Sequence, residues 1–412
     1  MAWWHPILPS KGTLIRAVSV LAITLAVQYA EYRGLFANLE GCVLDLFLRR
    51  TQAKQSPIIL VEIGDEAYRA CFASQSPLNP SRIASVVRAL QSAGPSVIGV
   101  DILTDAVPAA ESPAYRDLAA RIGKPPQTVW IAGSEKHKVV TADFFAWLVG
   151  VHDEIIIRPT RILGYEPGTL PPTGWGVSVF ASDEDLRLRR LPRRVAMSSD
   201  PDNPATIEQG ISLARTVAEI YCRSHSCKFD HENENEVYFS YGWPNQHFDV
   251  DRLFRCPQMQ PAGPLWQEFA AHVVGKIVLL GGTFSASNDF HATPAGRIAG
   301  VDISAHAINS EINGTNVAEV PRYAVVILDL LIGCLIVLIF GSSLKIRAMI
   351  VASLALTAVA SLASVILMWR GLVWLTWIGV AVGLFPHIVW EIYHAGGTHV
   401  PPRHPTPPNT II

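Results

Sequence analysis

Acidic residues stand at the ends of two predicted strands and again in a later glycine-rich segment. Asp65 follows the apolar run 57–63, and Asp101 ends the run 96–101. In open parallel sheets, ligands bind beyond the carboxyl ends of the strands. One hypothesis is therefore a pocket for a small ligand or an ion that both carboxylates share with Asp289. The alternative is that these carboxylates cap turns.

A metal site is a weaker interpretation of the same region. Asp289, His291 and His306 are residue types that can bind a metal ion. Their spacing matches no metal motif, and His306 lies among apolar residues with helical spacing, which favours packing. We predict no metal and no cofactor. We also predict no catalytic residue, because no nucleophile motif occurs, and a membrane-tethered hydrolase is unsupported.

A cluster of arginines follows the acidic turn 183–185. Such a cluster could bind an anion or lipid head groups. We expect the ordinary alternative, a solvated strand face with the odd-numbered residues pointing outward. The residues are Arg187, Arg189, Arg190, Arg193 and Arg194.

The chain has 412 residues, of which 50% are hydrophobic and 17% charged, and its net charge is −2. Four apolar stretches frame it, at 14–30, 323–341, 346–369 and 372–393. About 20 apolar residues span a bilayer as a helix, so the three late stretches are predicted membrane helices. The first stretch is an uncleaved anchor or a signal peptide. We favour the anchor, because 28–30 is a poor cleavage site.

Positive residues beside the spans indicate the orientation, since they favour the cytoplasmic side. Lys11 and Arg16 precede or open the first stretch, and Lys345 and Arg347 lie in the turn after the second. Both termini are therefore expected inside and the large domain outside. No long basic run is present, so we predict no nucleic-acid partner.

Asp329 lies about two turns inside the second apolar stretch. A carboxylate within a membrane is costly and is a functional hypothesis by default. Arg370, between the third and fourth stretches, is its expected partner. This pair would fix the packing of neighbouring membrane helices.

Strands alternate with helices through the large domain. We predict strands at 57–63, 96–101, 128–132 and 276–281, with helices at 82–93, 115–122 and 301–312. Ser81 is the expected cap of the first helix. The alternation predicts an α/β domain with a mainly parallel sheet, plus about four transmembrane helices.

Cysteine spacing leaves one question open. The six cysteines contain no CxxC pair, so a zinc knuckle or a redox motif is not expected. If the large domain lies outside the cytoplasm, Cys222 and Cys227 could form a disulfide. Free thiols are the equally weighted alternative.

Several segments, in order, resemble the CHASE type 2 family. They are 58–65, the helix that begins at Arg82, 97–103, the turn 183–187 and above all 275–313, with Asp289, Thr293-Pro294, Gly300 and Ala305-His306. The resemblance covers roughly 39–320. The family is an extracytoplasmic sensory domain associated with bacterial cyclases and histidine kinases, with one leading and typically three trailing spans. Gly64 inside the first strand-end motif and Leu103 in place of a phenylalanine depart from its pattern.

The resemblance implies a domain organisation. We expect an anchor at 14–36, a sensory domain at 37–320, three helices at 323–393 and a short Pro-rich cytoplasmic tail at 394–412. Its candidate ligand-binding residues are Asp65, Arg82, Asp101, Asp289, His291 and Thr293. No output domain follows the last span, so any output is expected on another polypeptide.

Two functions remain open. The first is a sensor in the bacterial inner membrane that detects a small-molecule ligand or the envelope state. It would signal to a separate cytoplasmic protein, with a homodimer as a further expectation by analogy. The second is a non-catalytic envelope scaffold that assembles a complex through its membrane helices.

Overall fold

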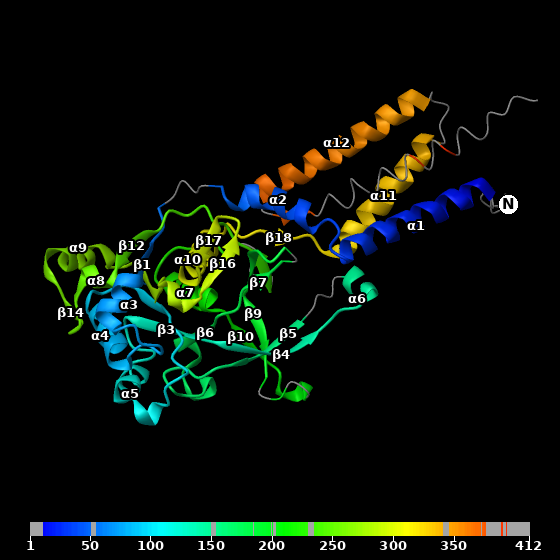
Figure 1. Ribbon diagram of the computed structural model, residues 1–412. Coiled ribbons are helices and arrows are strands. Elements are labelled where there is room, and N and C mark those ends of the chain that lie inside the picture. Colours follow the sequence, from blue (N-terminus) through cyan, green and yellow to red (C-terminus); the bar gives the residue numbers. More distant parts are fainter. Residues whose placement is uncertain are drawn as a thin grey trace, which may run out of the picture. The chain divides into compact units, whose positions relative to one another are not determined.

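The computed structural model describes residues 11–50, 55–149, 154–183, 185–198, 200, 203–229, 235–340, 346–371, 373–375, 389 and 393 (Figure 1). The chain divides into two compact units. We call residues 37–142 and 152–319 the α/β unit. We call residues 1–36, 143–151 and 320–412 the helical unit.

A six-stranded parallel sheet forms the centre of the α/β unit, which confirms the predicted α/β domain with a mainly parallel sheet. The strand order is β12-β1-β15-β2-β3-β6, and neighbours are parallel throughout. The strands are β1 (Ile58–Ile63), β2 (Val97–Asp101), β3 (Gln127–Ala132), β6 (Trp175–Val177), β12 (Gln246–Asp249) and β15 (Ile277–Gly282). Four of them are the predicted apolar runs.

Helices cover both faces of this sheet (Figure 1). Side chains alternate along a strand, so Ile59, Val61 and Ile63 of β1 enter one core, formed with α3 (Asp65–Phe72), α4 (Pro80–Ser92), α5 (Pro113–Ala119), α8 (Val250–Leu253) and α9 (Gly263–Val273). The opposite face carries α7 (Leu213–Cys222) and α10 (Gly300–Asn313). Gly281 of β15 allows α10 to approach, because a Cβ there would lie 2.5 Å from Val301.

The amino end of α4 corrects one prediction. Asn79, not Ser81, caps the helix: its side chain accepts hydrogen bonds from the backbone N–H of Ser81 at 3.0 Å and of Arg82 at 3.3 Å. Pro80 then occupies the first helical position, where its missing N–H costs nothing. Asn79 takes the cap position because the proline that follows it is the first residue of the helix.

Smaller elements complete the α/β unit. One sheet has the order β10-β9-β5-β4 and another β11-β8-β7. Their strands are β4 (Ser134–Val140), β5 (Glu154–Pro159), β7 (Ala181–Ser182), β8 (Leu188–Pro192), β9 (Arg194–Met197), β10 (Glu208–Ile211) and β11 (Glu236–Tyr238). The remaining elements are α2 (Ala37–Leu48), β13 (Phe254–Arg255), β14 (Gln260–Pro261), β16 (Phe290–Thr293), β17 (Gly296–Ala299), β18 (Ala318–Glu319) and the 3₁₀ helices η1 (Ala109–Glu111), η2 (Pro167–Thr169), η3 (Pro172–Gly174), η4 (Pro204–Thr206) and η5 (Ser285–Ser287).

The expectation of a solvated arginine face is wrong at two of its positions. The Arg189 side chain is 1% exposed and that of Arg193 3% exposed. Arg189 binds the carboxylates of Asp45, Asp183 and Asp185. Burial is possible because these fixed carboxylates replace the water around the guanidinium.

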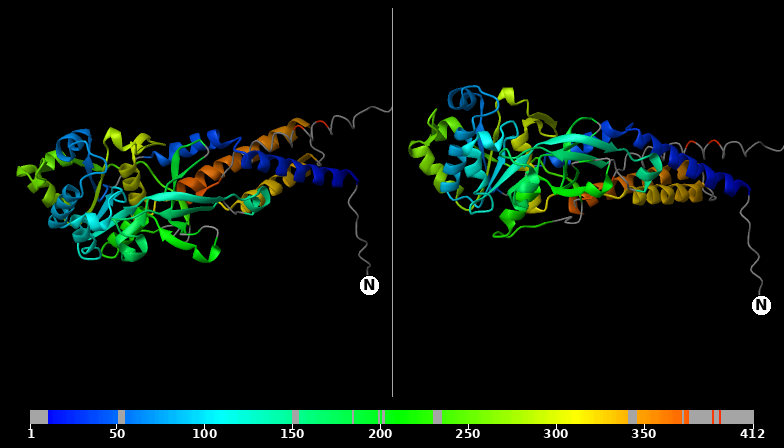
Figure 2. Two further views of the ribbon diagram at one scale, coloured as in Figure 1. Left: turned by 60° about the horizontal axis from the view of Figure 1, so that its bottom comes forward. Right: turned by 90° about the horizontal axis from the view of Figure 1, so that it is seen from below.

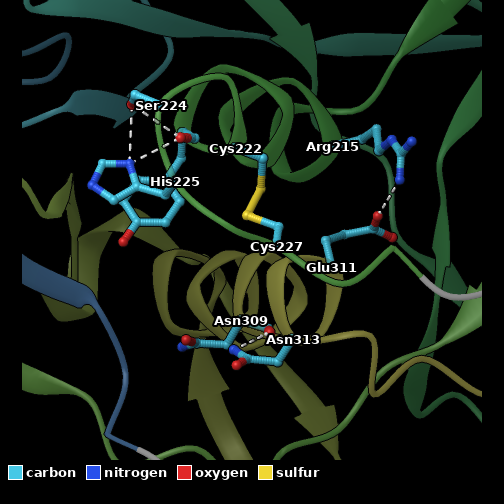
Figure 3. The surroundings of a disulfide bond; sticks show 9 residues. Arg215, Cys222, Ser224, His225, Cys227, Asn309, Glu311 and Asn313 are labelled. Carbon is cyan, nitrogen blue, oxygen red and sulfur yellow. Dashed lines mark hydrogen bonds and ion pairs between the residues drawn. A yellow bond between two sulfur atoms is a disulfide. The ribbon is translucent and has the colours of Figure 1, made fainter.

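The α/β unit contains two disulfides. Cys222 and Cys227, whose pairing the sequence left open, are bonded between the end of α7 and the loop that follows (Figure 3). Cys71 of α3 is bonded to Cys256 across a sequence separation of 185 residues, a pairing that spacing alone does not indicate. Cys42 is a free, exposed cysteine.

The helical unit contains α1 (Lys11–Tyr32), α6 (Phe144–Leu148), α11 (Arg322–Phe340), α12 (Ile346–Gly371) and β19 (Val373–Trp374). Among the described residues, two helical segments are long and apolar enough to cross a membrane, Arg322–Ile339 and Ile350–Arg370. The expected first span coincides with α1, which is not one of them, and the expected fourth lies mostly outside the described residues. The predicted count of four spans is therefore not confirmed.

Candidate functional site

The loop after β15 crosses the carboxyl edge of the central sheet between the ends of β1 and β2. Asp65, the first residue of α3, holds this loop: it accepts hydrogen bonds from the backbone N–H of Ser285 at 2.8 Å and from its hydroxyl at 2.9 Å. The backbone bond and then the hydroxyl bond lower the pKa of Asp65. Asp65 thus fastens the loop that carries Asp289.

Asp101, at the end of β2, lies close to the far end of the same loop. Its carboxyl group accepts a hydrogen bond from the Ser304 hydroxyl of α10 at 2.9 Å. Burial, followed by the negative charge of Asp289, raises the pKa of Asp101 to about 7. Asp101 therefore exchanges a proton near neutral pH, which an ordinary aspartate does not.

Asp289 and His291 form the accessible side of this group. His291 Nε2 lies 2.8 Å from Asp289 Oδ1, and the two side chains are 41% and 43% exposed. Asp289 lies at the amino end of α10, where a helix favours negative charge, and its backbone oxygen accepts from Gly300. The absence of a side chain at Gly300 provides the space for the Asp289 carboxylate, because a Cβ there would lie 2.2 Å from one of its oxygens.

The raised pKa of Asp101 predicts a pH-dependent stability. Because the folded-state pKa is raised to about 7, the contribution of protonated Asp101 is complete below the unfolded-state pKa near 4 and is lost as the pH rises through about 7. One pKa unit corresponds to about 1.4 kcal/mol, so the free energy of unfolding should fall by about 4 kcal/mol across this window. Denaturation of the Asp101→Asn variant from pH 4 to 8 should lose the contribution of Asp101 and show a smaller fall, because the raised pKa of Asp302, about 6, still contributes in this window. The matched Asp65→Asn variant should keep the full fall, and equal slopes in both variants would contradict the assignment.

The structure places Arg82 and Thr293 in bonds within the fold. The Arg82 guanidinium donates to the backbone oxygen of Cys71. The Thr293 hydroxyl donates to the backbone oxygen of Gly296 at 2.7 Å and accepts from the N–H of Ala295 at 3.1 Å, which closes the β16–β17 turn. Of the six candidates, Asp101, Asp289 and His291 interact with one another, whereas Asp65 holds their loop.

A small, partly open hollow adjoins this group. Its volume is about 10 Å³, and it is bordered by Ser304, Ser178, Phe180 and Leu191 among other residues. A volume of this size holds about one water molecule, so the hollow is too small to be a ligand pocket by itself. Ser304 borders the hollow and also bonds to Asp101, so the hydroxyl connects the two.

A second polar group lies on the α10 face of the sheet. Glu62 of β1, His247 of β12 and Asp302 of α10 offer one ligand atom each, and these atoms all lie within 4.8 Å of one another. His247 Nδ1 lies 2.8 Å from Glu62 Oε1. Burial and then the charge of Glu62 raise the pKa of Asp302 to about 6. Sequence reasoning missed this group, although a glutamate inside an apolar strand was a signal for it.

The helical unit places Asp329 at the contact of α1 with α11, which lie side by side (Figure 2). Asp329 is 1% exposed, and Thr24 and Gln28 of α1 adjoin its carboxyl group. Arg370 is exposed, and the interactions described for Asp329 do not include it. The neighbours that the structure gives Asp329 are therefore polar residues of α1.

The carboxyl end of α1 and the amino end of α11 carry an ion pair and an aromatic cluster. Arg322 pairs with Glu31, and its guanidinium lies 4.7 Å from the ring centroid of Trp147. Trp147 of α6 also meets Tyr32 of α1 at 5.5 Å between centroids. Tyrosine and tryptophan gather at membrane–water boundaries, so this cluster suits the end of a span.

The chain combines a parallel α/β unit with two helices that are long and apolar enough to cross a membrane, among the residues that the structure describes. The CHASE2 domain family matches residues 18–344, which include most of α1, the α/β unit and α11. The chain belongs to this family, whose domain is an extracytoplasmic sensory domain. Searches of curated proteins and of solved structures gave no match.

Proposed function

We propose that this protein is a bacterial inner-membrane sensor. Its α/β unit lies outside the cytoplasm and detects a small ligand or the state of the envelope. Its membrane helices pass the signal to a separate cytoplasmic partner, with both termini of the chain on that side. The observation that carries the proposal is the CHASE2 match to residues 18–344, because the domain is a sensory one.

The disulfides support the extracytoplasmic placement. Cys71–Cys256 and Cys222–Cys227 both lie in the α/β unit. Disulfides persist in oxidising compartments and are rare in the cytosol. The positive residues beside the spans point to the same orientation.

The Asp101–Asp289–His291 group supports a detection site. It offers a carboxyl that titrates near neutral pH and an exposed carboxylate–imidazole pair. Perturbed titratable groups at the carboxyl edge of a parallel sheet are a usual feature of ligand sites. A small polar ligand, or the proton itself, fits this chemistry.

The segment α6 supports transmission to the membrane helices. It follows β4 and precedes β5 in the chain, yet residues 143–151 belong to the helical unit. There Phe144 packs against Tyr29 at 5.4 Å and Tyr32 at 5.6 Å between ring centroids. A movement of the β4–β5 hairpin would therefore reach α1 directly. A ligand shifts such an equilibrium only by its differential affinity for the two arrangements.

The test is to crosslink the protein in its native membranes, isolate it intact and identify the crosslinked proteins. We expect a kinase, a cyclase or another regulator in a stoichiometric amount, because the proposed signal must leave through a partner. The control is a variant with Phe144→Ala and Trp147→Ala. It should still crosslink to the partner protein, but it should no longer pass the proposed signal to that partner. Recovery of envelope-assembly proteins, or of the protein alone, would contradict the sensor and favour a scaffold.

A further inference from the structure

We propose that Glu62, His247 and Asp302 bind a first-row divalent metal ion of the Zn²⁺ type. The site lies on the α10 face of the central sheet, in a different place from the Asp101–Asp289–His291 group. The inference does not rest on the sensory function, since it concerns binding alone.

The register of the sheet brings two of the three residues together. In β1, Ile59, Val61 and Ile63 face the α3–α4 core, so the alternation of side chains turns Glu62 to the opposite face. His247 pairs with Leu60 of β1 in parallel register and shares that face. Their side chains meet at 2.8 Å. The backbone of two neighbouring strands thus fixes this pair.

Asp302 supplies the third ligand from α10, the helix that covers this face of the sheet. It lies in the first turn of α10, the helix that packs over β15 and β1. Within the described part of the chain, its carboxylate has neither a hydrogen bond nor an ion pair. It faces a second carboxylate, that of Glu62, whose charge acts on it. Two partly buried carboxylates that face each other are stabilised by a shared cation.

His306 is a further indication of a ligand at this face. It follows Asp302 by one helical turn and so lies on the same side of α10. The side chain is 9% exposed, and its Nδ1 is buried without a hydrogen-bond partner among the described residues. A buried imidazole nitrogen without a partner is rare unless an ion or a water meets it.

The donor set and its dimensions fit this ion class. Zn²⁺ binds imidazole nitrogen and carboxylate oxygen at about 2.0–2.2 Å, so ligand atoms of one ion lie at most about 4 Å apart. The three atoms here lie within 4.8 Å of one another. Side-chain shifts of about 1 Å would bring all three within binding distance of one ion. A nitrogen ligand among two carboxylates favours first-row metals over Ca²⁺ or Mg²⁺. Three protein ligands leave a position for water or His306.

The chain offers a matched control. His291 and Asp289 form the same kind of imidazole–carboxylate pair, also at 2.8 Å, with His291 41% exposed against 47% for His247. Asp289 and His291 belong to no three-residue metal-ligand group among the described residues. His291→Gln therefore removes an equivalent imidazole without removing the proposed site.

The experiment is titration calorimetry with Zn²⁺ on the full-length protein in lipid nanodiscs, free of affinity tag and treated with a chelator. We expect one Zn²⁺ per chain, an affinity at least tenfold weaker in His247→Gln and in Asp302→Asn, and a change of less than about twofold in His291→Gln. Circular dichroism checks that each variant is folded. The absence of stoichiometric Zn²⁺ binding, equal effects of His247→Gln and His291→Gln, or tighter binding of Ca²⁺ than of Zn²⁺ would each overturn the proposal.

Discussion

Replacing Arg189 with alanine should destabilise the α/β unit by about 3–5 kcal/mol, the usual cost of breaking a buried ion pair by removing one partner. The guanidinium Nε binds Asp45 at 2.6 Å, and its other nitrogens bind Asp183 at 2.8 Å and Asp185 at 2.6 Å. Asp45 belongs to α2, whereas the other two lie in the turn between β7 and β8. Without Arg189, three partly or fully buried carboxylates repel one another.

The pKa of Arg189 reflects two opposing effects, burial and hydrogen bonding to carboxylates. Burial alone lowers the pKa, but the hydrogen bonds to Asp185, Asp45 and Asp183 outweigh it and raise the pKa. The same packing explains Gly41 of α2: a Cβ there would lie 2.8 Å from an Arg189 nitrogen. The residue at position 41 must be small for α2 to reach the guanidinium.

The measurement for Arg189 is urea denaturation followed by tryptophan fluorescence, since Trp130 and Trp243 are buried in the α/β unit. Arg187→Ala is the control, because Arg187 also contacts Asp45 and Asp185 but is 38% exposed. It should cost less than about 1 kcal/mol. Arg189→Lys should fall between the two, because an ammonium keeps the charge but cannot bind two carboxylates as a planar fork. Equal costs for Arg187→Ala and Arg189→Ala would contradict the assignment.

The parallel sheet was predictable because its central strands are buried on both faces and therefore read as continuous apolar runs. The edge strand β12 was not, since its four residues Gln246–Asp249 are mostly polar. The proposed metal site depends on that strand. His247 and Glu62 are 185 residues apart, so only the strand register brings them together.

The burial of charged residues was also not predictable, because it depends on partners that are distant in the sequence. From sequence, the arginines of β8 and its neighbours are an exposed stripe, because the residues that neutralise them are distant: Asp45 is 144 positions from Arg189. The proximity of Asp101 to Asp289 was predictable, because both follow strands of one parallel sheet and the carboxyl ends of such strands meet at one edge. Strand ends follow from local sequence, whereas ion-pair partners require the tertiary fold.

Replacing Glu311 with leucine should also cost about 3–5 kcal/mol. Its carboxylate, which is 0% exposed, accepts from Arg193 at 2.6 Å and from Arg215 at 2.6 Å (Figure 3 shows the second bond). Asn316 donates to it as well, at 3.0 Å. The variant removes this carboxylate from two arginines, Arg215 of α7 and Arg193 between β8 and β9. The control is Glu219→Ala, which removes the other carboxylate on Arg215, at 2.8 Å but 40% exposed, and should cost less than about 1 kcal/mol.

A double variant identifies the cause of the Glu311 effect. If the cost arises from buried cations that have lost the Glu311 carboxylate, adding Arg193→Met to Glu311→Leu should restore part of the stability, because an apolar side chain then fills the buried place of Arg193. If the cost arises from lost attraction alone, the second change should be neutral. If it arises from a misfit of leucine, the second change should cost more. Urea denaturation of the single and double variants separates these outcomes, and a double variant less stable than Glu311→Leu would contradict the electrostatic account.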